Sequence, residues 1–177
     1  MSRTHVALLR GINVGKAKRI AMADLKRVVE SVGCTDVKTL LNSGNVAFTT
    51  RRTITGDGLR KAILAETGVD SRTIVLTAAE VETIMRENTL VDIANDPTRL
   101  VVYVPADTAR LAKLSAMHTT DWAPEVMAIG SRAAYVWSPD GLLAGKLFEV
   151  VGKQLKDGVT ARNWATMTKL QALLASG

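Results

Sequence analysis

The first strand constrains the fold more than any other segment of the chain. Residues 5–12, HVALLRGI, are apolar at most positions rather than at alternate positions. Such a run is typical of a strand that is covered on both faces, as in a sheet packed beneath helices. Apolar residues then recur at three- and four-residue spacing over 22–32, which predicts an amphipathic helix ending at Gly33.

The next patterns complete a βαββαβ order. Residues 36–50 form two short runs around Ser43-Gly44, which is the punctuation of a β-hairpin. We then expect a helix over 55–67, a strand over 71–77 and a helix over 78–88. This order is the signature of a ferredoxin-like α+β half, with an antiparallel sheet and helices on one face.

The second half of the chain begins in the same way. We expect a strand over 99–105, a helix from Asp107 to about Met117, a hairpin that turns at Gly130-Ser131 and a helix over 142–151. Thr160 is placed as the N-cap of a final helix with an apolar stripe.

The predicted fold class is therefore α+β, with two ferredoxin-like-related βαββα halves, antiparallel or mixed sheets and a C-terminal docking helix. We place the N-terminal half, βαββαβ plus a helix, at residues 1–95. The C-terminal half, βαββα plus the terminal helix, occupies residues 96–177.

Positive charge is concentrated near the N-terminus. The net charge of the chain is +6, and residues 1–27 hold seven bases against one acid, Asp24, so that the remainder is balanced. A local positive field attracts phosphates or acidic partners and is weakened by salt. The alternative is a solvated face that keeps the protein in solution.

Other features exclude several classes of protein. No stretch approaches the roughly 18 unbroken apolar residues of a membrane span, so no membrane partner is expected. Cys34 is the only cysteine, which excludes an internal disulfide and leaves no cysteine framework for a metal. A cytoplasmic protein is the simplest interpretation.

The segment between the first strand and the first helix is the first candidate site. It runs from Arg10 to Arg19 and contains two glycines, Gly11 and Gly15, and two lysines. A glycine turn after a strand exposes backbone N–H groups, and the start of a helix offers more, which suits a phosphate or carboxylate. The spacing matches neither a P-loop nor a dinucleotide fingerprint. The alternative is an ordinary glycine loop with solvated lysines.

Two further polar segments are candidates. Asn42-Ser43-Gly44-Asn45 has the residues that a tight turn needs, and the functional alternative is that its amides orient a polar ligand. Arg162 is assigned to the first turn of the final helix, where a cation opposes the helix dipole. Such a residue is often paired with a carboxylate or directed at a ligand.

No catalytic constellation is complete. His5 and His118 have no Cys, His or acidic neighbour at metal-ligand spacing, so no metal site is expected. Asp24 and Lys169 are candidates for a general acid or base, and the sequence names no cofactor. Aromatic residues make up 4% of the chain, which gives little support to nucleic-acid recognition by stacking.

The same segments resemble a bacterial family, the domain of unknown function 1697. The run from Leu8 to Gly15 is similar to the family's Leu-Leu-Arg-Gly-Ile-Asn-Val-Gly segment. Met22 and Leu25 match its Met-x-x-Leu helix, and Ser43–Val46 matches its Ser-Gly-Asn-Val hairpin. Ala161–Leu170 is similar to its closing segment, Thr-Arg-Asn-Trp-Asn-Thr-x-Thr-Lys-Leu.

The chain departs from the family pattern at a few positions. Lys16 stands where members commonly have a second glycine, and Leu40-Leu41-Asn42 replaces a Tyr-x-Gln or Tyr-x-Asn segment. Ala161 and Ala165 fall where threonine and asparagine are usual. The resemblance implies two α+β halves of ferredoxin-like character and no established activity. It also implies a functional role for the polar positions of the signature.

These observations lead to one main hypothesis and two alternatives. We expect an anionic ligand, a phosphate- or carboxylate-bearing small molecule or a nucleotide, to bind in a basic pocket between the two halves. The residues assigned to this site are Arg10, Asn13, Gly15, Asn42, Ser43, Gly44, Asn45, Arg162, Asn163 and Lys169. The alternatives are an enzyme of unrecognised class that uses the same pocket, and a module that binds nucleic acid or an acidic protein.

Overall fold

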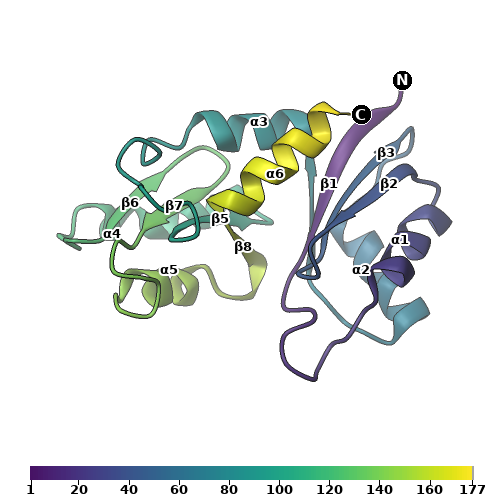
Figure 1. The fold of residues 1–177 in the computed structure, drawn as a ribbon, viewed down its shortest axis with the longest axis horizontal. Coiled ribbons are helices and arrows are strands. Elements are labelled where there is room, and N and C mark those ends of the chain that lie inside the picture. Colours follow the sequence, from purple (N-terminus) through teal and green to yellow (C-terminus); the bar gives the residue numbers. More distant parts are fainter. Residues whose placement is uncertain (177) are drawn as a thin grey trace. The chain divides into compact units, whose positions relative to one another are not determined.

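In the computed structural model, which describes residues 1–176, eight strands form two four-stranded sheets (Figure 1). The chain divides into two units, each containing one sheet. Unit 1 comprises residues 1–81 and the described residues from 170 onward, and unit 2 comprises residues 82–169.

Unit 1 has the βαββαβ order that the sequence predicts. Its sheet has the strand order β2-β3-β1-β4, and every neighbouring pair is antiparallel. The strands are β1 (Arg3–Leu9), β2 (Thr35–Leu40), β3 (Asn45–Thr50) and β4 (Thr73–Thr77). Helices α1 (Met22–Ser31) and α2 (Gly56–Thr67) lie on one face of the sheet (Figure 1), and α3 (Ala78–Arg86) follows β4.

The core of unit 1 lies between the sheet and the helices α1 and α2. Ala7 and Leu9 of β1 belong to the same buried cluster as Leu25 of α1. The alternate residues Val6 and Leu8 are also 0% exposed, so both faces of β1 are covered, as the apolar run predicts. Each large aliphatic side chain that is fully buried contributes roughly 1.5–3 kcal/mol to the free energy of unfolding.

The β2–β3 hairpin turns where the sequence predicts, and its turn packs on β1. Gly44 has φ +88°, and its carbonyl oxygen accepts a hydrogen bond from the Leu9 N–H at 2.9 Å. A Cβ atom on Gly44 would lie 2.8 Å from Leu9 Cβ and 2.9 Å from Ile12 Cδ1. Glycine is therefore required here both by the backbone conformation and by the close approach of two side chains.

Unit 2 repeats the same topology. Its strands are β5 (Leu100–Pro105), β6 (Val126–Ile129), β7 (Ala134–Trp137) and β8 (Val159–Asn163), in the antiparallel order β6-β7-β5-β8. Helix α5 (Leu147–Leu155) contributes Leu147 and Val151 to a buried cluster with Val101 and Val136 of the sheet. Helix α6 (Trp164–Ala175) is the last element.

The helix expected from Asp107 is formed mainly as a 3₁₀ helix, η1 (Thr108–Leu114), followed by the short helix α4 (Ser115–His118). The Asp107 side chain caps it by accepting from the Ala109 N–H at 2.9 Å. The apolar residues Leu111, Leu114 and Met117, which belong to the buried cluster, recur every three residues. This spacing matches the three residues per turn of a 3₁₀ helix.

The prediction that Thr160 is the N-cap of the final helix is wrong, because Val159–Asn163 forms the strand β8 and α6 starts at Trp164. The segment extends because it pairs with β5, with Ala161 opposite Tyr103. This pairing joins residues almost 60 positions apart, and the local pattern does not reveal it. The second half is therefore βαββαβ and not βαββα.

Helix α5 begins at Leu147, later than the expected start at residue 142. The buried carboxylate of Glu125 accepts hydrogen bonds from the Lys146 N–H (2.8 Å) and the Leu147 N–H (3.1 Å), which are at the start of this helix. An acidic group at that position satisfies N–H groups that have no partner within the helix. Glu125 therefore stabilises the start of α5.

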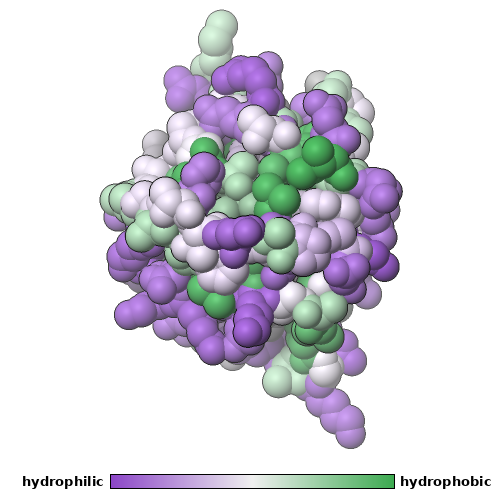
Figure 2. Space-filling view, turned by 90° about the vertical axis from the view of Figure 1, so that its left-hand side faces the viewer, coloured by the Kyte–Doolittle hydropathy of each residue, from purple (hydrophilic) through white to green (hydrophobic). Residues whose placement is uncertain are grey.

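Figure 2 shows one face of the protein, on which hydrophilic residues predominate and apolar residues form smaller patches. Exposed apolar side chains in unit 2 include Ile93 and Leu143. Over residues 1–176, no helix combines the length and the apolar character needed to cross a membrane.

We predict that Gly44→Ala lowers the free energy of unfolding more than Gly68→Ala does. Gly68 ends α2 with φ +73°, and a Cβ there would meet no atom within 4 Å. Gly68→Ala therefore costs only about 1 kcal/mol, for placing an alanine in the left-handed backbone conformation. Gly44→Ala adds the steric conflict with Leu9 and Ile12, for a total of about 3 kcal/mol. Urea unfolding followed by circular dichroism measures both, and equal losses would contradict the close packing at Gly44.

Candidate functional site

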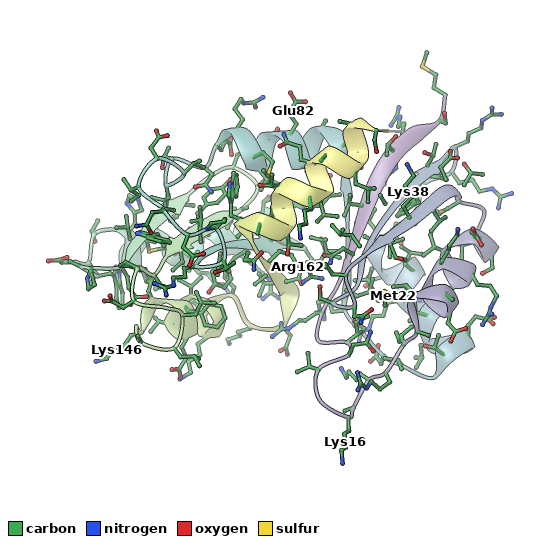
Figure 3. All side chains as sticks on the ribbon, in the orientation of Figure 1. Lys16, Met22, Lys38, Glu82, Lys146 and Arg162 are labelled. Atoms are coloured by element: carbon green, nitrogen blue, oxygen red, sulfur yellow. The ribbon has the colours of Figure 1, made fainter. Side chains whose placement is uncertain are left out.

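The basic loop, residues 10–20, joins β1 to α1. Ile12 and Ile20 are 1% and 5% exposed, and they anchor the loop in the core of unit 1. Between them, residues 14–19 are all exposed, and three are basic: Lys16, Lys18 and Arg19. Figure 3 shows Lys16 at the tip of the loop, with its side chain pointing away from the rest of unit 1.

Asn13 closes the base of the basic loop. Its Nδ2 donates to the carbonyl oxygens of Ile20 (2.9 Å) and Asn42 (2.8 Å), and its Oδ1 accepts from the Ile20 N–H (2.9 Å). Its backbone N–H donates to the Lys18 carbonyl oxygen at 3.0 Å. Asn13 has φ +56°, a conformation that asparagine tolerates better than most residues. The amide that we predicted to contact a ligand therefore sets the shape of the loop.

The turn of the β2–β3 hairpin lies against the base of the basic loop. The hydrogen bond from the Asn13 side chain to the Asn42 carbonyl oxygen joins the loop to this turn. Asn45 is 0% exposed, and its Nδ2 donates to the Leu40 carbonyl oxygen (2.8 Å) and to Ser43 Oγ (3.0 Å). The structure thus brings the first group of predicted site residues to one end of unit 1: Arg10, Asn13, Gly15, Asn42, Ser43, Gly44 and Asn45.

Arg72, which the sequence-based prediction did not include, lies beside the end of β1. The Arg10 N–H donates to the Arg72 carbonyl oxygen at 2.9 Å, and Ser71 Oγ donates to the Arg10 carbonyl oxygen at 2.8 Å. These contacts follow from the antiparallel pairing of β1 with β4, which places the start of β4 next to the end of β1. The strand pattern over 71–77 was visible in the sequence, but its pairing with β1 was not.

Several cations act on Asp70, at the same end of unit 1. Arg60 pairs with Asp70 through two hydrogen bonds, of 2.5 and 2.7 Å. The hydrogen bond from Arg60, together with the charges of Arg60, Lys18 and Arg72, holds the pKa of Asp70 below its ordinary value. Lys18 of the basic loop and Arg72, just before β4, are therefore close enough to one carboxylate to stabilise its charge.

A hollow of about 340 Å³ adjoins the basic loop where α1 and α2 meet. Its lining includes two bases, Arg19 and Arg27, and two acids, Asp24 and Glu66. Because these charges balance, the hollow itself does not favour an anion. Asp24, a predicted candidate for acid or base chemistry, forms an ion pair with Arg27.

Arg162 lies on β8 and not in the first turn of the final helix, so the predicted conflict with the helix dipole does not arise. Its side chain is buried, and its Nη1 donates to Thr160 Oγ1 (2.9 Å) and to the Ala161 carbonyl oxygen (2.9 Å). Burial lowers the pKa of Arg162 to about 10. The guanidinium is therefore still protonated at pH 7.

Asn163 and Lys169 complete the set of predicted site residues. Asn163 Oδ1 accepts from the Thr166 N–H at 2.9 Å, which makes Asn163 the cap of α6. Lys169 is exposed on α6. Together with Arg162 these residues belong to unit 2, whereas the other predicted residues belong to unit 1. That both groups serve one ligand remains a prediction.

Comparisons with known proteins agree with the resemblance noted in the sequence. The model of the family described as Protein of unknown function (DUF1697) matches residues 1–135. No curated protein matches the chain. The chain is similar to the solved structure of the conserved bacterial protein SP0830 from Streptococcus pneumoniae, with 20% identity and a TM-score of 0.76. The match covers 98% of this chain and 99% of that chain, and it shows the fold.

We predict that Asn13→Asp destabilises unit 1. The aspartate keeps the acceptor for the Ile20 N–H, but it replaces the two donated bonds with repulsion between oxygens. The expected loss is about 1–3 kcal/mol in the free energy of unfolding, measured by urea denaturation.

Asn42→Asp is the matched control for Asn13→Asp. It introduces the same charge on the adjoining turn, where the side chain is exposed and only the backbone oxygen bonds to Asn13. Equal stability of the two variants would show that the Asn13 amide does not hold the loop.

Proposed function

We propose that this protein, which belongs to the DUF1697 family of proteins of unknown function, binds an anionic small molecule or nucleotide through a phosphate or carboxylate. The observation that carries the proposal is the basic loop of unit 1. Its exposed residues 14–19 include three bases, and the Asn13 amide closes its base.

The conformation of the basic loop favours an anion. Gly11, Asn13, Gly15 and Lys18 all have positive φ, so the chain curves repeatedly within eight residues. Successive backbone N–H groups in such curves form concave sites for anions. Because both ends of the loop are anchored, less conformational entropy is lost on binding than in an unanchored loop.

The surrounding charges add to the attraction. Arg10 and Arg72 are joined through their backbones at the end of β1, and both Arg72 and Lys18 of the loop act on the Asp70 carboxylate. The nearby carboxylate of Asp70 is engaged by Arg60. The local charge therefore remains positive, and a positive field raises the local concentration of anions.

From unit 2 we assign three residues to the same function: Arg162, Asn163 and Lys169. The Arg162 guanidinium stays charged despite its burial, and its planar fork of donors matches the oxygens of phosphate or carboxylate.

We also interpret both units as ferredoxin-like, from their βαββαβ order and strand order. The single thiol, Cys34, is buried and free, which favours a cytoplasmic location.

We predict that wild-type protein shows a concentration-dependent rise in melting temperature with inorganic pyrophosphate at low ionic strength. The triple variant Lys16→Ala/Lys18→Ala/Arg19→Ala should lose most of the rise because it removes the exposed charges of the loop. The rise should also shrink as salt increases, since exposed charges are screened.

A charge-matched variant, Lys38→Ala/Lys61→Ala/Lys113→Ala, separates the loop from net charge. These lysines are exposed elsewhere on the protein, so this variant should keep the wild-type response. An undiminished response in the loop variant, or an equal loss in both variants, would show that the basic loop is not the site.

A further inference from the structure

The other end of the unit 1 sheet holds a second basic hollow, with a volume of about 530 Å³. Its lining includes Arg3, Arg51 and Arg52 and contains no acidic residue. Arg3 begins β1, whereas the basic loop follows the opposite end of that strand (Figure 1). The seven residues of β1 separate the two places by about 23 Å.

The strand register explains why basic and hydroxyl side chains meet in this hollow. Arg3 pairs with Thr50, and His5 pairs with Thr77. Alternate residues of a strand share a face, so Arg3 and His5 point to the same side of the sheet as Leu9. Leu9 packs in the core beneath the helices, and the hollow therefore continues the helix-covered face to the end of the sheet.

Thr50 holds the chain where it leaves β3. Its Oγ1 accepts from the Arg52 N–H at 3.0 Å and donates to the Arg52 carbonyl oxygen at 3.3 Å. The Arg52 guanidinium lies over Gly33, with Nη1 3.3 Å from the position that a Cβ of Gly33 would take. These contacts keep the backbone of Arg51 and Arg52 at the wall of the hollow.

The arginines of the hollow are not engaged in ion pairs with carboxylates of the described residues, and the Glu80 carboxylate behind the lining accepts hydrogen bonds from the Thr77 N–H (2.8 Å) and Oγ1 (3.2 Å). The ion pairs within residues 1–81 include those that join Lys26 to Glu30, Arg27 to Asp24 and Arg60 to Asp70. None of them involves Arg3, Arg51 or Arg52. Like charges that share a hollow repel one another, and an anion bound among them relieves that repulsion.

The remaining wall suits an organic group. Ile54 and Val75 are half-buried there, and the His5 ring stacks on Phe48 with ring centroids 5.6 Å apart and an interplanar angle of 11°. The volume falls within the range of about 300–1,000 Å³ that is typical of small-molecule sites. An inorganic ion would use only the arginine side of such a hollow.

We propose that this second hollow binds an organic phosphate. Arg3 and Arg51 hold the phosphate through charge-assisted hydrogen bonds, the charge of Arg52 adds to the attraction, and the organic part lies against Ile54, Val75 and the His5 ring. The site is distinct from the basic loop and does not depend on the function proposed for that loop.

Nuclear magnetic resonance titration of the full-length protein with ADP tests this proposal at the site itself. The backbone amides of Thr50 and Thr53 should shift to saturation and report the Kd of the second hollow alone. Arg3→Ala/Arg51→Ala should raise this Kd at least about tenfold because two charge-assisted contacts are lost. Both arginines are exposed, so the variant should unfold at the same urea concentration as the wild type.

Two controls separate this site from net charge and from the basic loop. Lys61→Ala/Lys113→Ala removes two exposed charges elsewhere, and Lys16→Ala/Lys18→Ala/Arg19→Ala removes those of the loop. Both variants should keep the wild-type Kd at Thr50 and Thr53. The proposal is overturned if these amides do not shift, or if the arginine variant binds ADP as the wild type does.

Two other probes define the class of ligand. Inorganic pyrophosphate should bind more weakly than ADP, because it makes no contact with the organic wall, and equal affinity would contradict the assignment of an organic ligand. A 12-nucleotide RNA should bind no more tightly than ADP. Tighter binding of the RNA, with a steep loss of affinity as salt increases, would identify a nucleic-acid backbone as the occupant and overturn the proposal.

Discussion

The amide of Asn13 is the interaction on which the N-terminal end of the protein depends. One side chain bonds to both backbone groups of Ile20 and to the carbonyl oxygen of Asn42, so it closes the basic loop and joins it to the hairpin turn. The buried side chains of Ile12 and Ile20 anchor the two ends of the loop in the core of unit 1. Without this closure, the exposed bases of residues 14–19 would belong to a flexible segment and would have no defined arrangement.

This closure changes how the polar family signature is interpreted. Asn13 and Asn45 both donate their amide hydrogens within the protein, and Gly44 is glycine because Leu9 and Ile12 leave no room for a Cβ. Part of a polar signature therefore serves the fold. Exposed charged side chains are the stronger candidates for ligand binding in unit 1, and they lie near both ends of β1: Lys16, Lys18 and Arg19 at one end, and Arg3 and Arg51 at the other.

Local patterns predicted most elements because each has its own periodicity or turn chemistry, as in the helix over 22–32 and the turn at Ser43-Gly44. They failed at β8, where Val159–Asn163 is extended only because it pairs with β5. The same limit applied to the sites. Arg72 lies beside Arg10, and Arg3 beside Thr50, through strand pairing alone. A sequence shows that bases are present, but the register of the sheet decides which of them meet.

The most direct test of the central claim is a titration of the ¹⁵N-labelled full-length protein with inorganic pyrophosphate, followed residue by residue. The account predicts that the backbone amides of residues 13–19 move together along one saturable curve, because a closed loop responds as a unit. Shifts that avoid these amides, or that grow linearly without saturation, would contradict the claim that the loop is a preformed anion site.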